Sequence, residues 1–323
     1  MLLFSLLFWG VIYSCAANWQ HLGALVSCVH SLRGLVLSGL RGFGLARETY
    51  PNHQPGPFRA PPSNFIVNKS SHWRHHFDNP NAYFCGVFTF LDKILGTALS
   101  LKGKTIAVTG ASGSLGRSLL FHLHTKGAKV IALTSSEQTV TLNVNGENLP
   151  VKTISWQMGK ESELAKELEQ VDILIINHGI NVHGEATGEA IAQSFQVNTF
   201  PSWRLLELFL TTVRTNEDIA TKEVWLNTSQ AEVSPAFSPV SDLVTLRRLD
   251  APCVFRKLIL EPFKSPLNPK EVMSADSVAK QIINLAQRDV RNIVVSFNLR
   301  VYLTHSLKDF FVSNYFHNYI KKY

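Results

Sequence analysis

From residue 105 onward, short apolar runs alternate with stretches whose apolar residues recur every three or four positions. The first pattern predicts strands and the second predicts amphipathic helices. The expected strands are Thr105–Thr109, Val130–Leu133, Lys152–Trp156, Ile173–Asn177, Val224–Asn227, Val254–Leu258 and Ile293–Ser296. The expected helices lie at about 115–126, 161–169, 188–197, 201–214, 241–249 and 276–287. Alternating strands and helices form a parallel sheet with crossovers, so residues 102–300 are expected to form a doubly wound α/β domain.

The pattern before this domain is different. No charged residue precedes Arg33, and Met1–Ala17 is an apolar run close to the length that spans a bilayer. A cleaved signal peptide is the alternative, but the positively charged start of such peptides is absent. Residues 22–46 are apolar and interrupted by Arg33 and Arg41, which favours an interfacial position. Residues 1–47 are therefore expected to be a membrane-associated helical segment, with the positive charges that follow placing the α/β domain on the cytoplasmic side.

Two further segments flank the α/β domain. Residues 48–64 hold five prolines, which predicts a loop at the start of the region 48–101. Residues 301–323 have apolar positions at 307, 310, 311 and 315 on one helical face. This C-terminal helix either closes the α/β domain or lies on lipid, and the sequence leaves both open.

Composition strengthens the membrane interpretation. Only 17% of the residues are charged, against about 25% in ordinary soluble proteins. The net charge of +7 comes from scattered Lys and Arg residues without a basic run, so we expect no nucleic-acid partner. A basic face toward anionic lipid accounts for the same charge.

The first predicted strand leads into the turn Thr109-Gly-Ala-Ser-Gly-Ser-Leu-Gly116, and an amphipathic helix follows. In a strand–turn–helix unit, Gly110 permits the tight turn, Gly113 lets the backbone approach a pyrophosphate, and Gly116 lets the helix pack close to the sheet. Ser112, Ser114 and Leu115 complete the turn, and the helix N-terminus presents N–H groups to phosphate. The turn predicts a Rossmann sheet that binds a nicotinamide dinucleotide.

The end of the second strand distinguishes NADP from NAD. The strand is followed by Ser135 and Ser136, and the first acidic residue, Glu137, comes slightly late for a ribose 2′-hydroxyl. Hydroxyl groups can donate to a 2′-phosphate without repelling it. We therefore expect NADP, with NAD as the alternative.

Three further motifs resemble the short-chain dehydrogenase/reductase family. Asn177-His-Gly179 is similar to the family's Asn-Ala-Gly element, which lines the cofactor. Asn198 matches the family's active-site Asn, and Ser229 matches its active-site Ser. The resemblance implies hydride transfer between a nicotinamide and a carbonyl or alcohol carbon, with Ser229 polarising the carbonyl and Asn198 orienting a water molecule.

The family's catalytic Tyr and Lys have no counterpart. The corresponding positions hold Ser241 and Thr245, and no Tyr-x-x-x-Lys follows Ser229. Either catalysis is lost and the nucleotide site remains, or another acid serves. Glu261 stands where the family usually has glycine, and its carboxylate faces the nicotinamide amide or, as we favour, the solvent.

His72-x-x-His75-His76 resembles the last histidine box of the fatty acid hydroxylase/sterol desaturase family. Such a di-iron site needs several boxes, and no second one occurs upstream, so we expect a remnant without metal. The arrangement is similar to the C-terminal part of bifunctional sterol desaturase/short-chain dehydrogenase proteins. The sequence thus predicts a membrane-associated NAD(P)-dependent oxidoreductase acting on an apolar or lipid-derived carbonyl or alcohol, with a non-catalytic NADP(H)-binding protein as the alternative. It leaves the oligomeric state open.

Overall fold

A computed structural model describes residues 18–43, 57–58, 60–180, 187–229, 251–266, 268 and 271–320. The chain divides into two compact units, residues 1–54 and residues 55–323. The predicted span Met1–Ala17 lies outside the described residues. The first unit contains helix α2 (Asn18–Gly42), which overlaps the apolar segment 22–46 that was expected at a membrane interface.

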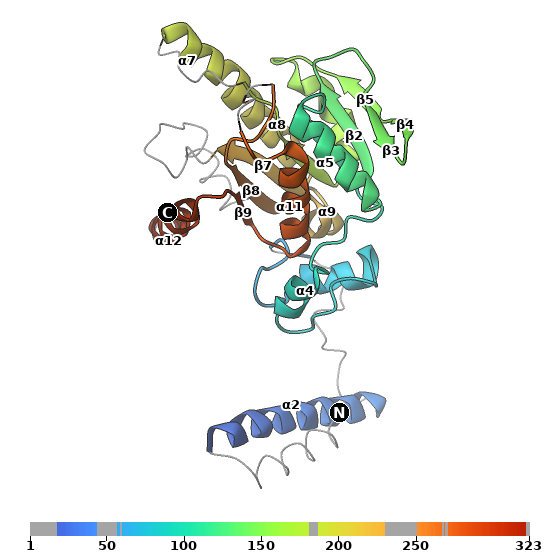
Figure 1. The fold of residues 1–323 in the computed structure, drawn as a ribbon. Helices are drawn as coiled ribbons and strands as arrows, with labels where there is room; N and C mark the ends of the chain where they lie inside the picture. The colour runs from blue at the N-terminus through green and yellow to red at the C-terminus, as the bar shows by residue number, and fades with distance from the viewer. Residues whose placement is uncertain are drawn as a thin grey trace. The chain divides into compact units, whose positions relative to one another are not determined.

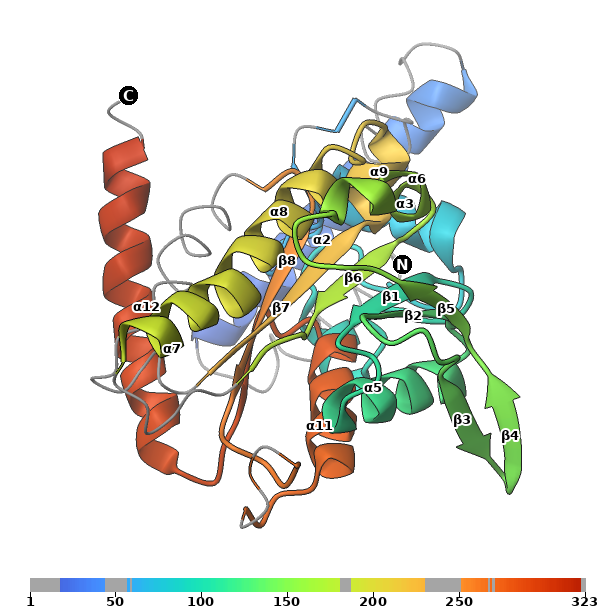
Figure 2. The same cartoon turned by 90° about the horizontal axis from the view of Figure 1, so that it is seen from above.

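The second unit is built on a seven-stranded parallel sheet with the order β5-β2-β1-β6-β7-β8-β9 (Figures 1 and 2). Its strands are β1 (Thr105–Thr109), β2 (Lys129–Thr134), β5 (Lys152–Ser155), β6 (Ile173–Ile176), β7 (Glu223–Ser229), β8 (Val254–Leu260) and β9 (Asn292–Val295). All seven predicted strands are present, within three residues at each end. The order changes direction at β1, where β2 lies on one side and β6 on the other, and such a crossing point is where open α/β sheets bind ligands.

Helices cover both faces of this sheet. They are α5 (Ser114–Thr125), the 3-10 helix η2 (Glu161–Leu164) with α6 (Ala165–Glu169), α7 (Gly188–Ser194), the π-helix η3 (Phe195–Thr199), α8 (Phe200–Leu210), α9 (Asn216–Thr221) and α11 (Ala275–Gln287). The two predicted helices at 188–197 and 201–214 are one continuous stretch with a π-helical middle. The predicted helix at 241–249 lies outside the described residues.

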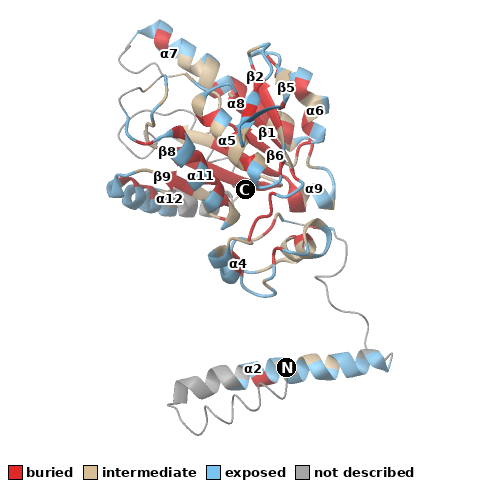
Figure 3. Ribbon diagram, turned by 45° about the vertical axis from the view of Figure 1, so that its right-hand side comes forward, coloured by how far each residue is buried: buried red, intermediate tan, exposed pale blue. Residues whose placement is uncertain are grey.

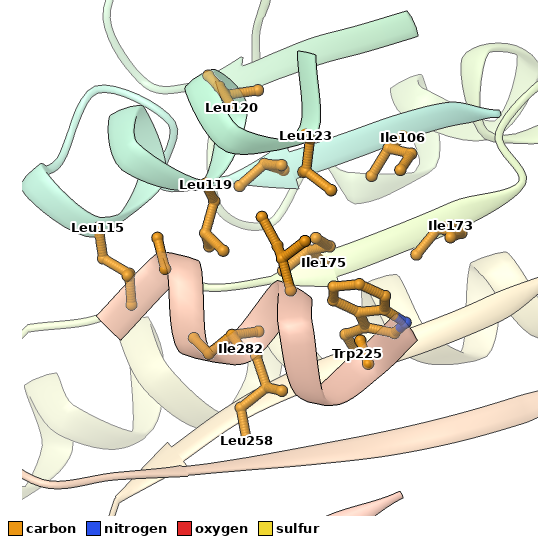
Figure 4. Packing of buried hydrophobic residues seen from close by; sticks show 14 of the residues in the cluster. Ile106, Leu115, Leu119, Leu120, Leu123, Ile173, Ile175, Trp225, Leu258 and Ile282 are labelled. Atoms are coloured by element: carbon orange, nitrogen blue, oxygen red, sulfur yellow. The ribbon is translucent and has the colours of Figure 1, made fainter. Parts of the chain in front are cut away.

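The sheet separates two hydrophobic layers. On one face α5 and α11 pack on the strands, with Leu119, Ile282 and Trp225 fully buried between them (Figure 4). On the other face α6 and α8 bury Leu168 and Phe209. Each such side chain contributes about 1.5–3 kcal/mol by leaving water. These layers hold the carboxyl ends of β1, β2, β6 and β7 in fixed register.

A two-stranded hairpin, β3 (Thr141–Val144) with β4 (Glu147–Pro150), interrupts the connection from β2 to β5. Asn145 and Gly146 both have positive φ, 53° and 90°, which matches the tight turn that Asn-Gly pairs favour. The sequence prediction missed this hairpin, although the Asn-Gly pair is a strong signal for one.

Residues 60–101 are folded and belong to the same compact unit as the sheet. They contain α3 (Lys69–Trp73), the π-helix η1 (Arg74–Asp78) and α4 (Phe90–Leu95), and they lie beside the amino ends of the strands (Figure 1). Arg74 is buried there. Its guanidinium donates to the Ala220 carbonyl and to Glu223, the first residue of β7.

Glu223 is the centre of a buried charge cluster. Its carboxylate pairs with Arg74 and Arg256, at 3.1 and 2.7 Å, and accepts from the Trp225 indole. The flanking arginines outweigh the effect of burial and hold the pKa of Glu223 well below its usual range, at about 2. Asp289 pairs in turn with Arg256 at 2.8 Å. The cluster connects the segment 60–101 to the amino edge of the sheet.

The last helix, α12 (Leu299–Ile320), follows β9 and begins two residues before the predicted start. Most of its described side chains are exposed (Figure 3). Within the described part of the chain, no helix combines the length and the apolar character that crossing a membrane requires.

Candidate cofactor site

The glycine turn lies between β1 and α5, at the carboxyl edge of the sheet. Gly110 has a φ of +62°, and a Cβ built on it would lie 2.9 Å from the Cα of His178. A Cβ on Gly116 would lie 2.8 Å from the Cα of Ala111 and would collide with the Gly110 carbonyl. Both positions therefore require glycine, as predicted. Gly113 is less crowded, because its Cβ would lie 3.3 Å from the Gly110 oxygen.

Helix α5 begins at this turn with Gly113 as its N-cap, and no side chain caps it. The N–H groups of the first turn, which include those of Ser114 and Leu115, are therefore available to an anion together with the positive end of the helix dipole. A side chain at Gly110 or Gly116 would fill the space beside this helix end. The turn thus fits the pyrophosphate of a dinucleotide.

The end of β2 is tied to the same turn. Thr134 is buried, and its hydroxyl donates to Ser112 Oγ over 3.1 Å. Ser135 is exposed and Ser136 is half-buried, so both predicted ribose-side hydroxyls lie within reach of solvent. Arg117 was not predicted. Its Nε donates to the Ser112 carbonyl at 3.0 Å, which places an exposed guanidinium beside the turn.

A hydrogen-bond network joins the residues that follow β6 to Thr109, the last residue of β1. Its hydroxyl oxygen accepts from the backbone N–H groups of Asn177 and His178, at 2.8 and 3.1 Å. Since both lone pairs of this oxygen are occupied, the hydroxyl hydrogen goes to His178 Nδ1 at 2.8 Å in preference to the Ile175 carbonyl at 3.5 Å. The network therefore assigns the hydrogen of the imidazole to Nε2, which lies 3.3 Å from Ser202 Oγ.

Burial keeps this imidazole neutral. The pKa of His178 falls from its ordinary 6.5 to about 4, because burial disfavours the charged form more than the Glu161 carboxylate favours it. Where the resembling family has alanine, this chain thus has a neutral histidine that bonds to the first residue of the glycine turn.

Asn198 lies in the π-helix η3 and holds the chain that follows β6. Its Oδ1 accepts from the Ile180 N–H at 2.8 Å, and its Nδ2 donates to the Ile180 carbonyl at 3.1 Å. A Cβ on Gly179 would lie 3.1 Å from the same Oδ1. Asn198 therefore lies close to Gly179, and it acts on the site through the backbone that it positions.

The end of β7 adds two polar side chains, Asn227 and Ser229, to the carboxyl edge of the sheet. Asn227 donates to Asn177 Oδ1 at 3.0 Å, and its own Oδ1 is buried without a hydrogen-bond partner among the described residues. Ser229 is the last residue of β7 and is exposed. The structure thus places the predicted Asn177, Asn198 and Ser229 at one edge, together with Asn227, which was not predicted as a site residue. Ser241 and Thr245 lie outside the described residues.

Glu261, which follows β8, keeps part of its surface in solvent, the environment favoured for it. Its carboxylate accepts from the Phe297 N–H at 2.6 Å and is half-buried, so it fixes the chain between β9 and α12.

The histidine cluster lies at the opposite, amino edge of the sheet. His72 and His76 approach each other with 3.1 Å between their Nε2 atoms, whereas His75 Nδ1 lies 2.9 Å from the Ala82 carbonyl. No group of three possible metal ligands occurs among the described residues. The residue between these histidines, Arg74, joins the segment to β7.

Comparison with known proteins identifies the class. Residues 104–218 match the family described as short chain dehydrogenase. The chain is 52% identical over 312 residues to a monoglucosyldiacylglycerol epimerase of Synechocystis sp., which covers 93% of this chain and 76% of that protein. It is also 38% identical over 90 residues to the 3-oxoacyl-acyl-carrier-protein reductase of Escherichia coli, covering 25% of this chain and 36% of that enzyme. The chain belongs to the short-chain dehydrogenase/reductase family.

Solved structures agree on the fold. An alcohol dehydrogenase of Comamonas testosteroni, specific for bulky-bulky ketones, matches with a TM-score of 0.52 and 14% identity, over 65% of this chain and 94% of that one. A short chain dehydrogenase of Burkholderia cenocepacia in complex with NADP matches with a TM-score of 0.51 and 15% identity, over 65% of this chain and 93% of that one. Nothing in these matches supports the predicted fusion with a sterol desaturase.

Proposed function

We propose that this chain is a membrane-associated, nicotinamide-dinucleotide-dependent enzyme that inverts one hydroxyl-bearing carbon in the sugar head group of a glucosylated diacylglycerol. The observation that carries the proposal is the 52% identity to a monoglucosyldiacylglycerol epimerase over nearly the whole chain. This identity narrows the substrate expected from the sequence, an apolar carbonyl or alcohol, to the glucosylated diacylglycerols. In these lipids the reacting carbon belongs to the sugar head group.

The cofactor site supports this chemistry. Inversion of a hydroxyl-bearing carbon requires that a hydride be removed from it and then returned. A bound nicotinamide dinucleotide would accept and return that hydride. Gly110, Gly113 and Gly116 with the N-terminus of α5 would hold its pyrophosphate, because they present N–H groups and exclude side chains. Asn177 and Gly179 would line the cofactor at the end of β6.

The protein's own residues must also move a proton, since the alcohol loses one as the carbonyl forms and regains it afterwards. Ser229, at the exposed end of β7, is the residue that would polarise the carbonyl oxygen. Asn198 is a positioning residue, because both polar atoms of its amide hold the backbone of Ile180.

The preferred cofactor is NADP. Ser135 and Ser136 offer hydroxyl groups beside β2, and the exposed guanidinium of Arg117 lies beside the same turn. A 2′-phosphate carries the negative charge that such a guanidinium binds. NAD is the alternative. We place the Rossmann domain on the cytoplasmic side of a membrane, because positive residues follow the apolar N-terminal run.

The second candidate function is a non-catalytic NADP(H)-binding protein. One observation favours it, namely that Ser241 and Thr245 stand at the positions of the catalytic Tyr and Lys. An alkyl hydroxyl is a far weaker acid than a phenol, so Ser241 could not take over the role of the Tyr unaided.

A single assay separates the candidates. The full chain, purified in detergent, is incubated with a monoglucosyldiacylglycerol and either NADP⁺ or NAD⁺, and the sugar configuration of the product lipid is read by proton NMR. We expect an epimer to accumulate without net reduction of the nucleotide. Stoichiometric NADPH with a ketone product would instead show a simple dehydrogenase. Nucleotide binding without lipid turnover would favour the non-catalytic protein, and failure to bind either nucleotide would contradict both candidates.

A further inference from the structure

Helix α12 touches the α/β domain with one narrow face. Val301 packs on Ile259 and Val294 in a small hydrophobic cluster. Two turns further along, Asp309 Oδ2 accepts from the Asn292 side chain at 2.9 Å. His305, halfway between them, is buried. Residues 301, 305 and 309 are four apart, so the contact follows a single line along the helix.

The apolar residues of α12 lie on the other side. Five of them are 60–71% exposed, namely Leu299, Leu303, Leu307, Phe310 and Phe311. At about 100° per residue these five fall within an arc of about 120°, whose centre is roughly opposite the line through 301, 305 and 309. A helix that closes a domain turns its apolar face inward. In the described part of α12 that face is turned away from the domain, which favours a helix that lies on lipid.

The charges of α12 follow the same division. Its only acidic residue, Asp309, is turned toward β9, whereas Arg300 and Lys308 are exposed. Arg300 falls within the arc of the exposed apolar residues, and Lys308 lies at its border, about 60° beyond Phe311, so positive charge accompanies the large apolar side chains of the outward surface. This combination complements an anionic lipid surface, in which apolar side chains enter the acyl boundary and basic groups meet the head groups.

The position of α12 relates this surface to the cofactor site. The helix begins four residues after the end of β9, so its first turn lies at the carboxyl edge of the sheet. Phe297, which is exposed, borders the same edge. From there α12 runs back along β9, because Val301 meets the last strand residues and Asp309 meets the first.

We propose that the outward face of α12, defined by Leu299, Leu303, Leu307, Phe310 and Phe311, lies on an anionic bilayer and brings the carboxyl edge of the sheet to the head-group layer. This inference deepens the proposed function, on whose membrane location it rests, but it does not depend on the chemistry at the cofactor site. It explains how a head group could reach Ser229 while its acyl chains stay in the bilayer.

The test places a photoreactive benzoylphenylalanine at Phe310 of the full chain, which is then reconstituted on vesicles and irradiated. The matched control carries the same probe at Leu149, an exposed apolar residue of the β3–β4 hairpin. Both probes are placed in the full chain, so any membrane binding by the apolar N-terminal segment is the same in the two variants. Mass spectrometry identifies what each probe has captured.

We expect lipid adducts at Phe310 in several-fold excess over Leu149, with a larger yield on vesicles of phosphatidylcholine and phosphatidylglycerol than on phosphatidylcholine alone. The double variant Arg300→Glu/Lys308→Glu should lower the yield on the mixed vesicles and retain NADPH binding. Equal adduct yields at the two positions, or cross-links from Phe310 to a second copy of the chain, would overturn the proposal. Lipid adducts without an epimerised product would refute the proposed function alone, and an epimerised product without adducts would refute the docking face alone.

Discussion

Gly116 leaves no room for a side chain, since a Cβ there would meet the backbone of both Gly110 and Ala111. We expect Gly116→Ala to push α5 away from the turn, to cost about 1–3 kcal/mol of unfolding free energy, and to weaken NADPH binding at least about tenfold. Fluorescence titration and urea unfolding measure the two effects. Gly188→Ala is the matched control, because nothing lies within 4 Å of a Cβ at that position. Equal NADPH affinities in the two variants would contradict the assignment of the turn.

His178 makes the stability of the fold depend on pH. Its pKa is about 4 in the folded chain and 6.5 ordinarily, so the unfolded chain binds the extra proton first as the pH falls. The stabilisation is complete above pH 6.5 and is lost as the pH falls toward 4. Between pH 7 and pH 5 we expect a loss of about 1–2 kcal/mol in urea unfolding, and a smaller loss in His178→Asn, which has no group titrating there. Parallel pH profiles for the two proteins would show that His178 is not the group responsible.

Residue identities at the site were predictable where the backbone itself is constrained. Gly110 and Gly116 are required by steric contacts within a local turn, and Asn177 follows the strand that the apolar run predicts. Arg117 was missed although its partner, the Ser112 carbonyl, belongs to the same local turn. Asn227 was missed because only the folded edge brings it close to Asn177. The interaction of His178 with Thr109, 69 positions away, has no local pattern either.

At the scale of elements, Arg74 joins the segment 60–101 to β7. Arg74→Ala would leave the buried carboxylate of Glu223 with one arginine fewer, and we expect a loss of about 3–5 kcal/mol of unfolding free energy. The segment should also become sensitive to limited proteolysis while the sheet resists it. His76→Ala, at an exposed position two residues away, is the control and should change stability by about 0.5 kcal/mol or less. If both variants unfold at the same urea concentration, Arg74 does not hold the segment.

The elements themselves were predictable to different degrees. The sheet strands follow from apolar runs, because a parallel sheet is buried on both faces. The β3–β4 hairpin and α9 were missed although both carry signals in the sequence, Asn145-Gly146 for the hairpin and the capping box of Thr215 and Asp218 for the helix. The folding of residues 60–101 could not be predicted, since its anchor pairs residues 149 positions apart. The apolar periodicity of α12 predicted a helix but not the direction in which its apolar face points.

At the scale of the whole molecule, nucleotide binding should stabilise the fold. NADPH at 100 times its dissociation constant adds about 2.7 kcal/mol, which for a domain of this size raises the Tm by about 5–10 °C. Thermal unfolding of the full chain with NADPH and with NADH measures the difference, and NADPH should give the larger shift. At the same NADPH concentration, Gly116→Ala with a tenfold weaker site should show about half the shift or less. An equal shift in that variant would indicate that NADPH binds elsewhere.

The bond between Arg74 and Glu223 also sets an order of events during synthesis of the chain. At about 5–20 residues per second, the ribosome needs roughly 7–30 seconds to make the 149 residues that separate the two partners. During that interval the guanidinium of Arg74 lacks its carboxylate partner, the first residue of β7. The part of the molecule that is made early is therefore fixed late.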